Sequence, residues 1–259
     1  LLDEAAHEAR IGILYEAGNQ WEDWSKTMDI IEGRGINRQI RRVYGWLASR
    51  YRSGDRIFLI GFSRGAYAVR SLAGVIGQVG LLTREHATER MVREAYRHYQ
   101  DSTSPETCLA FRKAYCLEEA PIEMIGVFDT VKSLGFRAPF VVRWAEVKHA
   151  FHDHTLAPHV RRGFHALALD ETREAFTPVL WKCPPDHKGH VQQVWFRGSH
   201  GDVGGQLTGM HEARPLSNIP LVWMVERLEE CRLPLPVGWR AKFPMDPDAP
   251  SVGNWRGWG

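Results

Sequence analysis

The sequence is poor in cysteine, carries little net charge and has no long hydrophobic run. Its four cysteines, Cys108, Cys116, Cys183 and Cys231, show no Cys-x-x-Cys spacing. Neither a disulfide framework nor a zinc site is therefore indicated, and free thiols suited to a reducing compartment are expected. A net charge of +2 is too balanced to indicate binding to nucleic acid or to an anionic membrane surface. No apolar run approaches the roughly 18 residues that a membrane-spanning helix needs.

The start of the chain lacks the features of a signal peptide. We therefore expect a cytoplasmic location, with any secretion following a route that needs no signal peptide. The 259 residues contain no internal repeat and no linker rich in proline, glycine or serine, which indicates a single domain over residues 1–259. Because the chain begins at Leu1 rather than at methionine, we expect it to be truncated at its N-terminus.

Apolar runs alternate with helical patterns along the chain. We expect strands over residues 10–15, 56–62, 122–128 and 191–196, and helices over residues 36–52, 64–78, 84–100, 106–117, 139–175 and 218–232. Alternation of this kind is typical of an α/β fold with a mostly parallel central sheet and helices on both faces. The continuous apolar character of 56–62 and 122–128 indicates strands that are buried on both faces.

A Gly-x-Ser-x-Gly motif, Gly61-Phe62-Ser63-Arg64-Gly65, lies between an expected strand and an expected helix. This order is typical of a serine nucleophile on a tight turn, with glycines that let strand and helix cross closely. The helix N-terminus favours negative charge there, and the backbone N–H of Arg64 would be one donor of an oxyanion hole. We predict that Ser63 is a nucleophile; the alternative is an ordinary turn that holds a serine.

Two later residues follow apolar strands, as a catalytic acid and base should in an α/β-hydrolase. Asp129 ends the next apolar strand after Ser63, and His200 follows the strand after that. His200 would accept the serine proton, and Asp129 would orient the imidazole. Asp129 could instead cap a helix, and His200 could be an ordinary histidine in the glycine-rich loop 198–205. Asp202 is the competing acid or a brace for that loop, and His165 is a supporting residue or the competing base.

A run of histidines raises the separate hypothesis of a metal-assisted hydrolase. The run comprises His149, His152, His154, His159 and His165, with Asp153 or Asp202 as added ligands. His-x-x-His and His-x-His spacings can bind transition metals. No His-Glu-x-x-His motif is present, so we predict neither a metal site nor a cofactor.

Four segments, in this order, resemble the uncharacterised α/β-hydrolase domain family that includes the type VI secretion lipase effectors, family one. They are Gly61–Tyr67 with Arg70–Gly74, Gly126–Val131 with Ser133–Gly135, His165–Glu171, and Trp195–Gly205. The resemblance implies a Ser-Asp-His hydrolase of ester bonds, with phospholipid esters as substrates of the effector members. It assigns the three catalytic roles to Ser63, Asp129 and His200.

The chain departs from that family at its start. The family usually begins with a strand carrying a Phe-Asp-Gly-Thr-like motif, whose loop would supply the second oxyanion donor, and no such motif precedes Ile11. The membrane-anchoring regions of the lipase effectors are also absent from these 259 residues.

These observations lead to one expected function and two alternatives. We expect a serine esterase or lipase that acts on a small or lipid ester through an acyl-enzyme, without nucleic acid as a partner. The first alternative is a hydrolase fold that serves only as a binding module. The second is the metal-assisted hydrolase.

Overall fold

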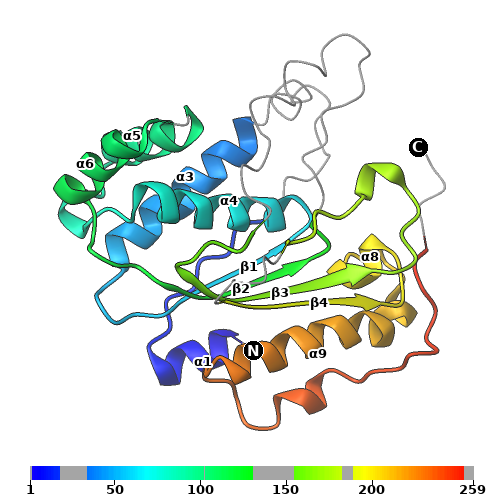
Figure 1. Cartoon of the computed structure of the whole chain (residues 1–259). Coiled ribbons are helices and arrows are strands. Elements are labelled where there is room, and N and C mark those ends of the chain that lie inside the picture. Colours follow the sequence, from blue (N-terminus) through cyan, green and yellow to red (C-terminus); the bar gives the residue numbers. More distant parts are fainter. Residues whose placement is uncertain (1, 18–33, 102, 131–154, 183–188, 254–259) are drawn as a thin grey trace.

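The centre of the fold is a parallel sheet of four strands, seen in a computed structural model that describes residues 2–17, 34–101, 103–130, 155–182 and 189–253 (Figure 1). The strand order is β1-β2-β3-β4, and every neighbouring pair is parallel. The strands are β1 (Ile57–Phe62), β2 (Ile122–Phe128), β3 (Val160–Ala168) and β4 (His190–Phe196). This arrangement confirms the expected α/β class.

Helices cover both faces of the sheet (Figure 1). One face carries α3 (Arg34–Arg50), α4 (Arg64–Val79), α5 (Glu89–Gln100) and α6 (Pro105–Tyr115); the other carries α1 (Leu2–Ala9) and α9 (Arg214–Glu230). The short helix α8 (His200–Gly204) follows β4. The part of the chain that the structure describes also contains short 3-10 helices: η2 (Arg84–His86), η3 (Glu174–Phe176), η4 (His211–Ala213) and η5 (Trp239–Lys242).

The core lies on both sides of the two central strands. In β2 six of the seven residues are buried, because helices pack on both of its faces. Ile125 and Val127 face the cluster beneath α3, α4 and α5, whereas Met124 packs with Met224 of α9 in the opposite cluster. The edge strand β4 is only partly buried.

The register brings the ends of β1 and β2 to the same level. Phe62 pairs with Phe128, and Phe128 pairs with Ala166. The ladder continues past both strand ends, since the Ser63 N–H donates to the Phe128 carbonyl at 3.1 Å and the Asp129 N–H donates to the Ala166 carbonyl at 2.8 Å. Ser63 and Asp129, the residues that directly follow β1 and β2, therefore lie at one edge of the sheet.

Two predicted elements are wrong. Residues 10–15 form no strand: Ile13 and Tyr15 are exposed, and Gly12 lies against the Trp46 side chain of α3 instead of pairing with a strand. The helix expected over 139–175 is wrong where the structure describes it, because residues 160–168 form β3. Its burial on both faces between β2 and β4 outweighs the local helical preference of Ala166 and Leu167.

Cys108, Cys116 and Cys231 are free thiols, as expected, and Cys183 lies outside the described residues. Within the described ranges, no helix is both long and apolar enough to cross a bilayer.

Candidate active site

Ser63 occupies a strained turn between β1 and α4. Its backbone angles are φ 55° and ψ −119°, a conformation that L-residues rarely adopt. The turn is tight because β1 and α4 cross closely: a Cβ on Gly61 would lie 2.4 Å from the carbonyl oxygen of Gly65. Strain at a single serine that directly follows a buried strand is typical of a functional position.

The two glycines of the motif have different roles. Gly61 permits the close crossing, since any side chain there would meet backbone atoms. A Cβ on Gly65 would meet nothing within 4 Å, so the expectation that Gly65 is also needed for the crossing is wrong. At the crossing, the backbone carbonyl of Gly65 is the group that lies against Gly61. Arg64 is the first residue of α4, so its N–H lies at the helix N-terminus, where the helix dipole favours negative charge.

Asp129 and His200 form a buried hydrogen-bonded pair. Nδ1 of His200 lies 2.6 Å from Oδ2 of Asp129, and the two residues are only 5% and 1% exposed. The other carboxylate oxygen, Oδ1, accepts a hydrogen bond from the Ala168 N–H at 3.2 Å. A carboxylate can only accept, so Nδ1 carries the proton and Nε2 is left as the basic nitrogen of the ring. Among the described residues, no hydrogen bond uses Nε2.

The imidazole of His200 packs between two phenylalanines. Its ring centre lies 4.6 Å from that of Phe62, the residue before Ser63, and 4.7 Å from that of Phe176 in η3. Gly204 makes room for this packing, since a Cβ there would lie 2.0 Å from the Phe62 ring. The histidine is thereby held beside the turn that carries Ser63.

His200 lies on a helix and not in the loop that the sequence suggested for 198–205. Ser199 precedes α8, and Asp202 on the first turn of that helix is 1% exposed. Oδ2 of Asp202 accepts from the Ser199 N–H at 2.8 Å, the Ser199 hydroxyl at 2.9 Å and the Ser251 hydroxyl at 2.6 Å. Oδ1 accepts from the Val252 N–H at 2.9 Å. The structure thus places Asp202 as the brace of α8, while Asp129 contacts the imidazole.

A third carboxylate, Glu171, which sequence reasoning did not single out, fixes the backbone of His200. Oε2 of Glu171 accepts from the His200 N–H at 3.2 Å and from Arg173 at 2.7 Å. The Arg173 guanidinium also lies 3.9 Å from the ring centre of Phe176. Burial alone would raise the pKa of Glu171, but the hydrogen bonds from Arg173 and from the His200 N–H lower it below its usual value. The signal in the sequence was an acidic pair, Asp170 and Glu171, directly after an apolar run.

His165 lies behind the Asp129 turn, on β3. It is fully buried, and its Nε2 accepts a hydrogen bond from the Thr130 N–H at 3.2 Å. Burial, together with the nearby charge of Arg70, lowers the pKa of His165 to about 3, so the ring is neutral at ordinary pH. Its ring packs edge-on against Trp181. This position suits a supporting residue that holds the backbone next to Asp129.

The histidine run is only partly within the described residues. His149, His152 and His154, together with Asp153, lie outside them. His159 packs beside Gly77 of α4, where burial lowers its pKa. Across the described ranges, no three His, Cys, Asp or Glu side chains form a group suited to a metal ion.

Comparison with known proteins points to one family. A family model described as the catalytic domain of Tle1-like phospholipase effectors of the type VI secretion system matches residues 5–227. The uncharacterized protein YEL023C of Saccharomyces cerevisiae is 32% identical over 169 residues, which are 61% of this chain and 23% of that protein.

Two solved structures are more distant. The crystal structure of an uncharacterized protein from Pseudomonas aeruginosa is 18% identical, with a TM-score of 0.41, over 83% of this chain and 30% of that one. The structure of the Tle1 effector bound to the VgrG spike of the type 6 secretion system is 20% identical, with a TM-score of 0.33, over 70% and 30%.

The chain spans less than a third of the length of each of these three proteins. Its parallel sheet, with helices on both faces, is α/β-hydrolase-like. Since the family model matches most of its length, the chain belongs to the family of Tle1-like phospholipase effector catalytic domains of the type VI secretion system.

Proposed function

We propose that this chain hydrolyses carboxylic esters, with phospholipid esters as the natural substrates, through a Ser63-His200-Asp129 triad and an acyl-enzyme on Ser63. The observation that carries the proposal is the buried contact of 2.6 Å between His200 and Asp129 beside the strained turn of Ser63. The membership in a phospholipase effector family supports the lipid substrate.

The proposed reaction begins with proton transfer from the Ser63 hydroxyl to Nε2 of His200 as Oγ attacks the ester carbonyl. Asp129 stabilises the imidazolium that forms, because its carboxylate lies against Nδ1. The negative charge that develops on the carbonyl oxygen is stabilised by the Arg64 N–H at the start of α4. His200 then gives its proton to the leaving alcohol as the tetrahedral intermediate collapses.

Deacylation repeats these steps with water. His200 removes a proton from the water, whose oxygen attacks the acyl-enzyme, and Ser63 leaves with the proton returned by His200. Two contacts keep the imidazole in place through both halves of the reaction: the Glu171 carboxylate accepts from the His200 backbone N–H, and the Phe176 ring packs against the imidazole.

The test is ester hydrolysis by matched variants. Hydrolysis of p-nitrophenyl butyrate should fall on the order of a million-fold in Ser63→Ala, and a double variant with His200→Ala should lose little more, because the two residues act as one unit. Ser53→Ala, which changes an exposed serine in the turn before β1, is the control and should retain full activity. Release of fatty acid from phosphatidylethanolamine vesicles, measured by mass spectrometry, tests the lipid substrate. Retention of more than a few per cent of activity in Ser63→Ala would contradict the proposal.

A further inference from the structure

A surface hollow of about 510 Å³ lies beside His200. It is lined by the segment that follows β3 and by Trp195 of β4. Phe176, which packs its ring 4.7 Å from the His200 imidazole, is part of the wall. The hollow therefore adjoins the proposed catalytic base at the carboxyl ends of the strands, where open α/β sheets bind their ligands.

Glu171 and Arg173, an oppositely charged pair in the wall, already form hydrogen bonds with each other. Glu171 and Arg173 bind each other through both carboxylate oxygens, at 2.7–2.9 Å. Arg173 also covers the ring of Phe176, and the Thr177 hydroxyl donates to the Glu174 carbonyl at 2.7 Å. This pair therefore adds no net charge to the wall, and among the described residues Glu174 is the one further ionisable residue that lines the hollow, so this wall offers no cationic site to an anionic headgroup.

The rest of the lining combines the polar side chains of Thr172, Glu174 and Thr177 with a group of apolar ones, two of which are unusually exposed. Leu169 is 60% exposed and Trp195 is 50% exposed, and both line the hollow. Trp195 of β4 pairs with Leu167 of β3, two residues before Leu169. The Leu169 N–H donates to the carbonyl of Phe196, the residue after Trp195, so the two apolar side chains start close together. Ala168 and Pro178 add further apolar surface. Exposed apolar side chains gathered in a concave surface next to reactive groups are typical of a ligand site.

We propose that this hollow binds the acyl chain of the ester substrate, with Leu169 and Trp195 as its specificity-determining walls. The inference rests on the proposed function, because it places the chain of the ester beside the base that would act on its carbonyl. Since each methylene moved from water to an apolar surface gains about fourfold in binding, kcat/KM should rise with acyl length until the hollow is filled.

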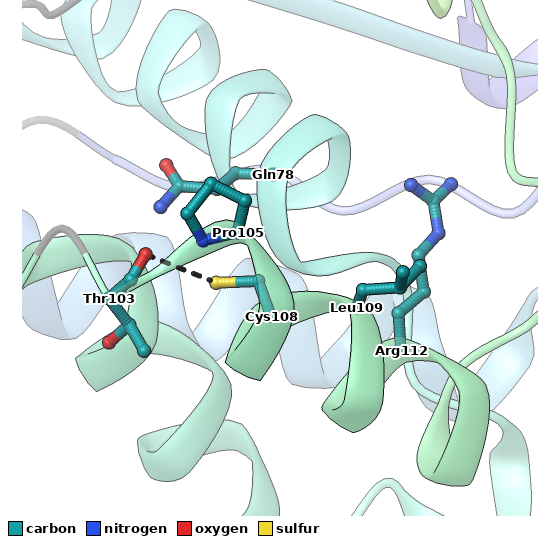
Figure 2. A pocket seen from close by; sticks show the side chains of 6 residues that line it. All are labelled: Gln78, Thr103, Pro105, Cys108, Leu109 and Arg112. Carbon is teal, nitrogen blue, oxygen red and sulfur yellow. Dashed lines mark hydrogen bonds between the residues drawn. The ribbon is translucent and has the colours of Figure 1, made fainter.

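A second hollow supplies a matched control. It measures about 280 Å³ and lies between the C-terminal half of α4 and helix α6 (Figure 2). Leu109 of α6 lines it and is 52% exposed, much like Leu169. Gln78, which also lines it, lies near the opposite end of α4 from Ser63. Leu109→Ala therefore removes an equally exposed leucine far from the proposed acyl site.

The experiment measures kcat/KM for p-nitrophenyl acetate and p-nitrophenyl octanoate. The wild-type protein should prefer octanoate, and Leu169→Ala and Trp195→Ala should each lower the octanoate-to-acetate ratio by about tenfold. Leu109→Ala should leave the ratio unchanged. A ratio that stays constant in Leu169→Ala and Trp195→Ala would overturn the inference while leaving the ester hydrolysis itself intact.

A binding measurement separates this inference from the proposed function. Octanoate titrated calorimetrically into the Ser63→Ala protein should bind more tightly than acetate, and Trp195→Ala in that background should weaken octanoate binding by about tenfold. This readout needs no turnover, so it holds even if Ser63 proves not to be the nucleophile. Equal binding of octanoate with and without the Trp195 side chain would refute the acyl site.

Discussion

Replacing Ser63 by glycine and by alanine should separate backbone strain from chemistry. Ser63 has φ 55° and ψ −119°, and a non-glycine residue in such a conformation costs about 1–3 kcal/mol. Glycine removes this cost but adds about 0.5–1 kcal/mol of conformational freedom to the unfolded chain. Alanine keeps the Cβ and therefore the strain. No hydrogen bond of the Ser63 hydroxyl is seen among the described residues, so neither change loses one.

We therefore expect Ser63→Gly to be more stable than Ser63→Ala by about 1 kcal/mol, which raises Tm by roughly 2–4 °C in a domain of this size. Both variants should lose ester hydrolysis alike, because neither has a nucleophile. Circular dichroism melts and urea midpoints of the wild type and the two variants measure the difference. If Ser63→Gly melts at or below Ser63→Ala, the turn is not strained in the way that its backbone angles indicate.

Three further changes probe the surroundings of His200. Gly204→Ala should lower ester hydrolysis at least a hundredfold. The alanine Cβ would lie 2.0 Å from the Phe62 ring and displace that ring from its position beside His200. Wild-type rates in this variant would contradict the expectation. Asp202→Asn should lower the free energy of unfolding by at least about 2 kcal/mol in urea titrations, since an amide cannot accept all the hydrogen bonds of that carboxylate, whereas kcat well below Tm should fall far less than in His200→Ala. Burial lowers the pKa of His165 to about 3 in the folded protein, whereas in the unfolded chain this histidine takes up a proton below about pH 6.5. The free energy of unfolding is therefore not reduced by this histidine above about pH 6.5, and it falls as the pH drops from there toward 3. Unfolding free energies measured across this range should fall less steeply in His165→Gln, and an unchanged slope would refute the assignment.

Apolar segments allowed three strands to be predicted correctly, although only the first two are nearly continuous in apolar residues. The segments 56–62, 122–128 and 191–196 correspond to β1, β2 and β4. The third strand of the sheet, β3, was predicted as helix, because Phe164–Ala168 has alanine and leucine at positions that suit a helix equally well. Only its pairing with β2 and β4 decides its structure, and that pairing is not visible in the local sequence.

Chain order and the positions of strand ends were enough to predict that Asp129 and His200 lie close together. Asp129 and His200 were chosen because each follows an apolar strand, and the structure puts them in contact. The contributions of Glu171 and Phe176 could not be predicted in this way. Glu171 acts on a backbone N–H and Phe176 on a ring, and both contacts exist only once the segment after β3 has folded over α8.

Covalent labelling tests the central claim, that Ser63 is an activated nucleophile, most directly. The protein is treated with a fluorophosphonate probe, digested, and mapped by mass spectrometry. We expect one adduct on the peptide that contains Ser63, with labelling slowed strongly in His200→Ala because the base is gone. An adduct on a different serine, or labelling of Ser63 at an unchanged rate without His200, would contradict the account.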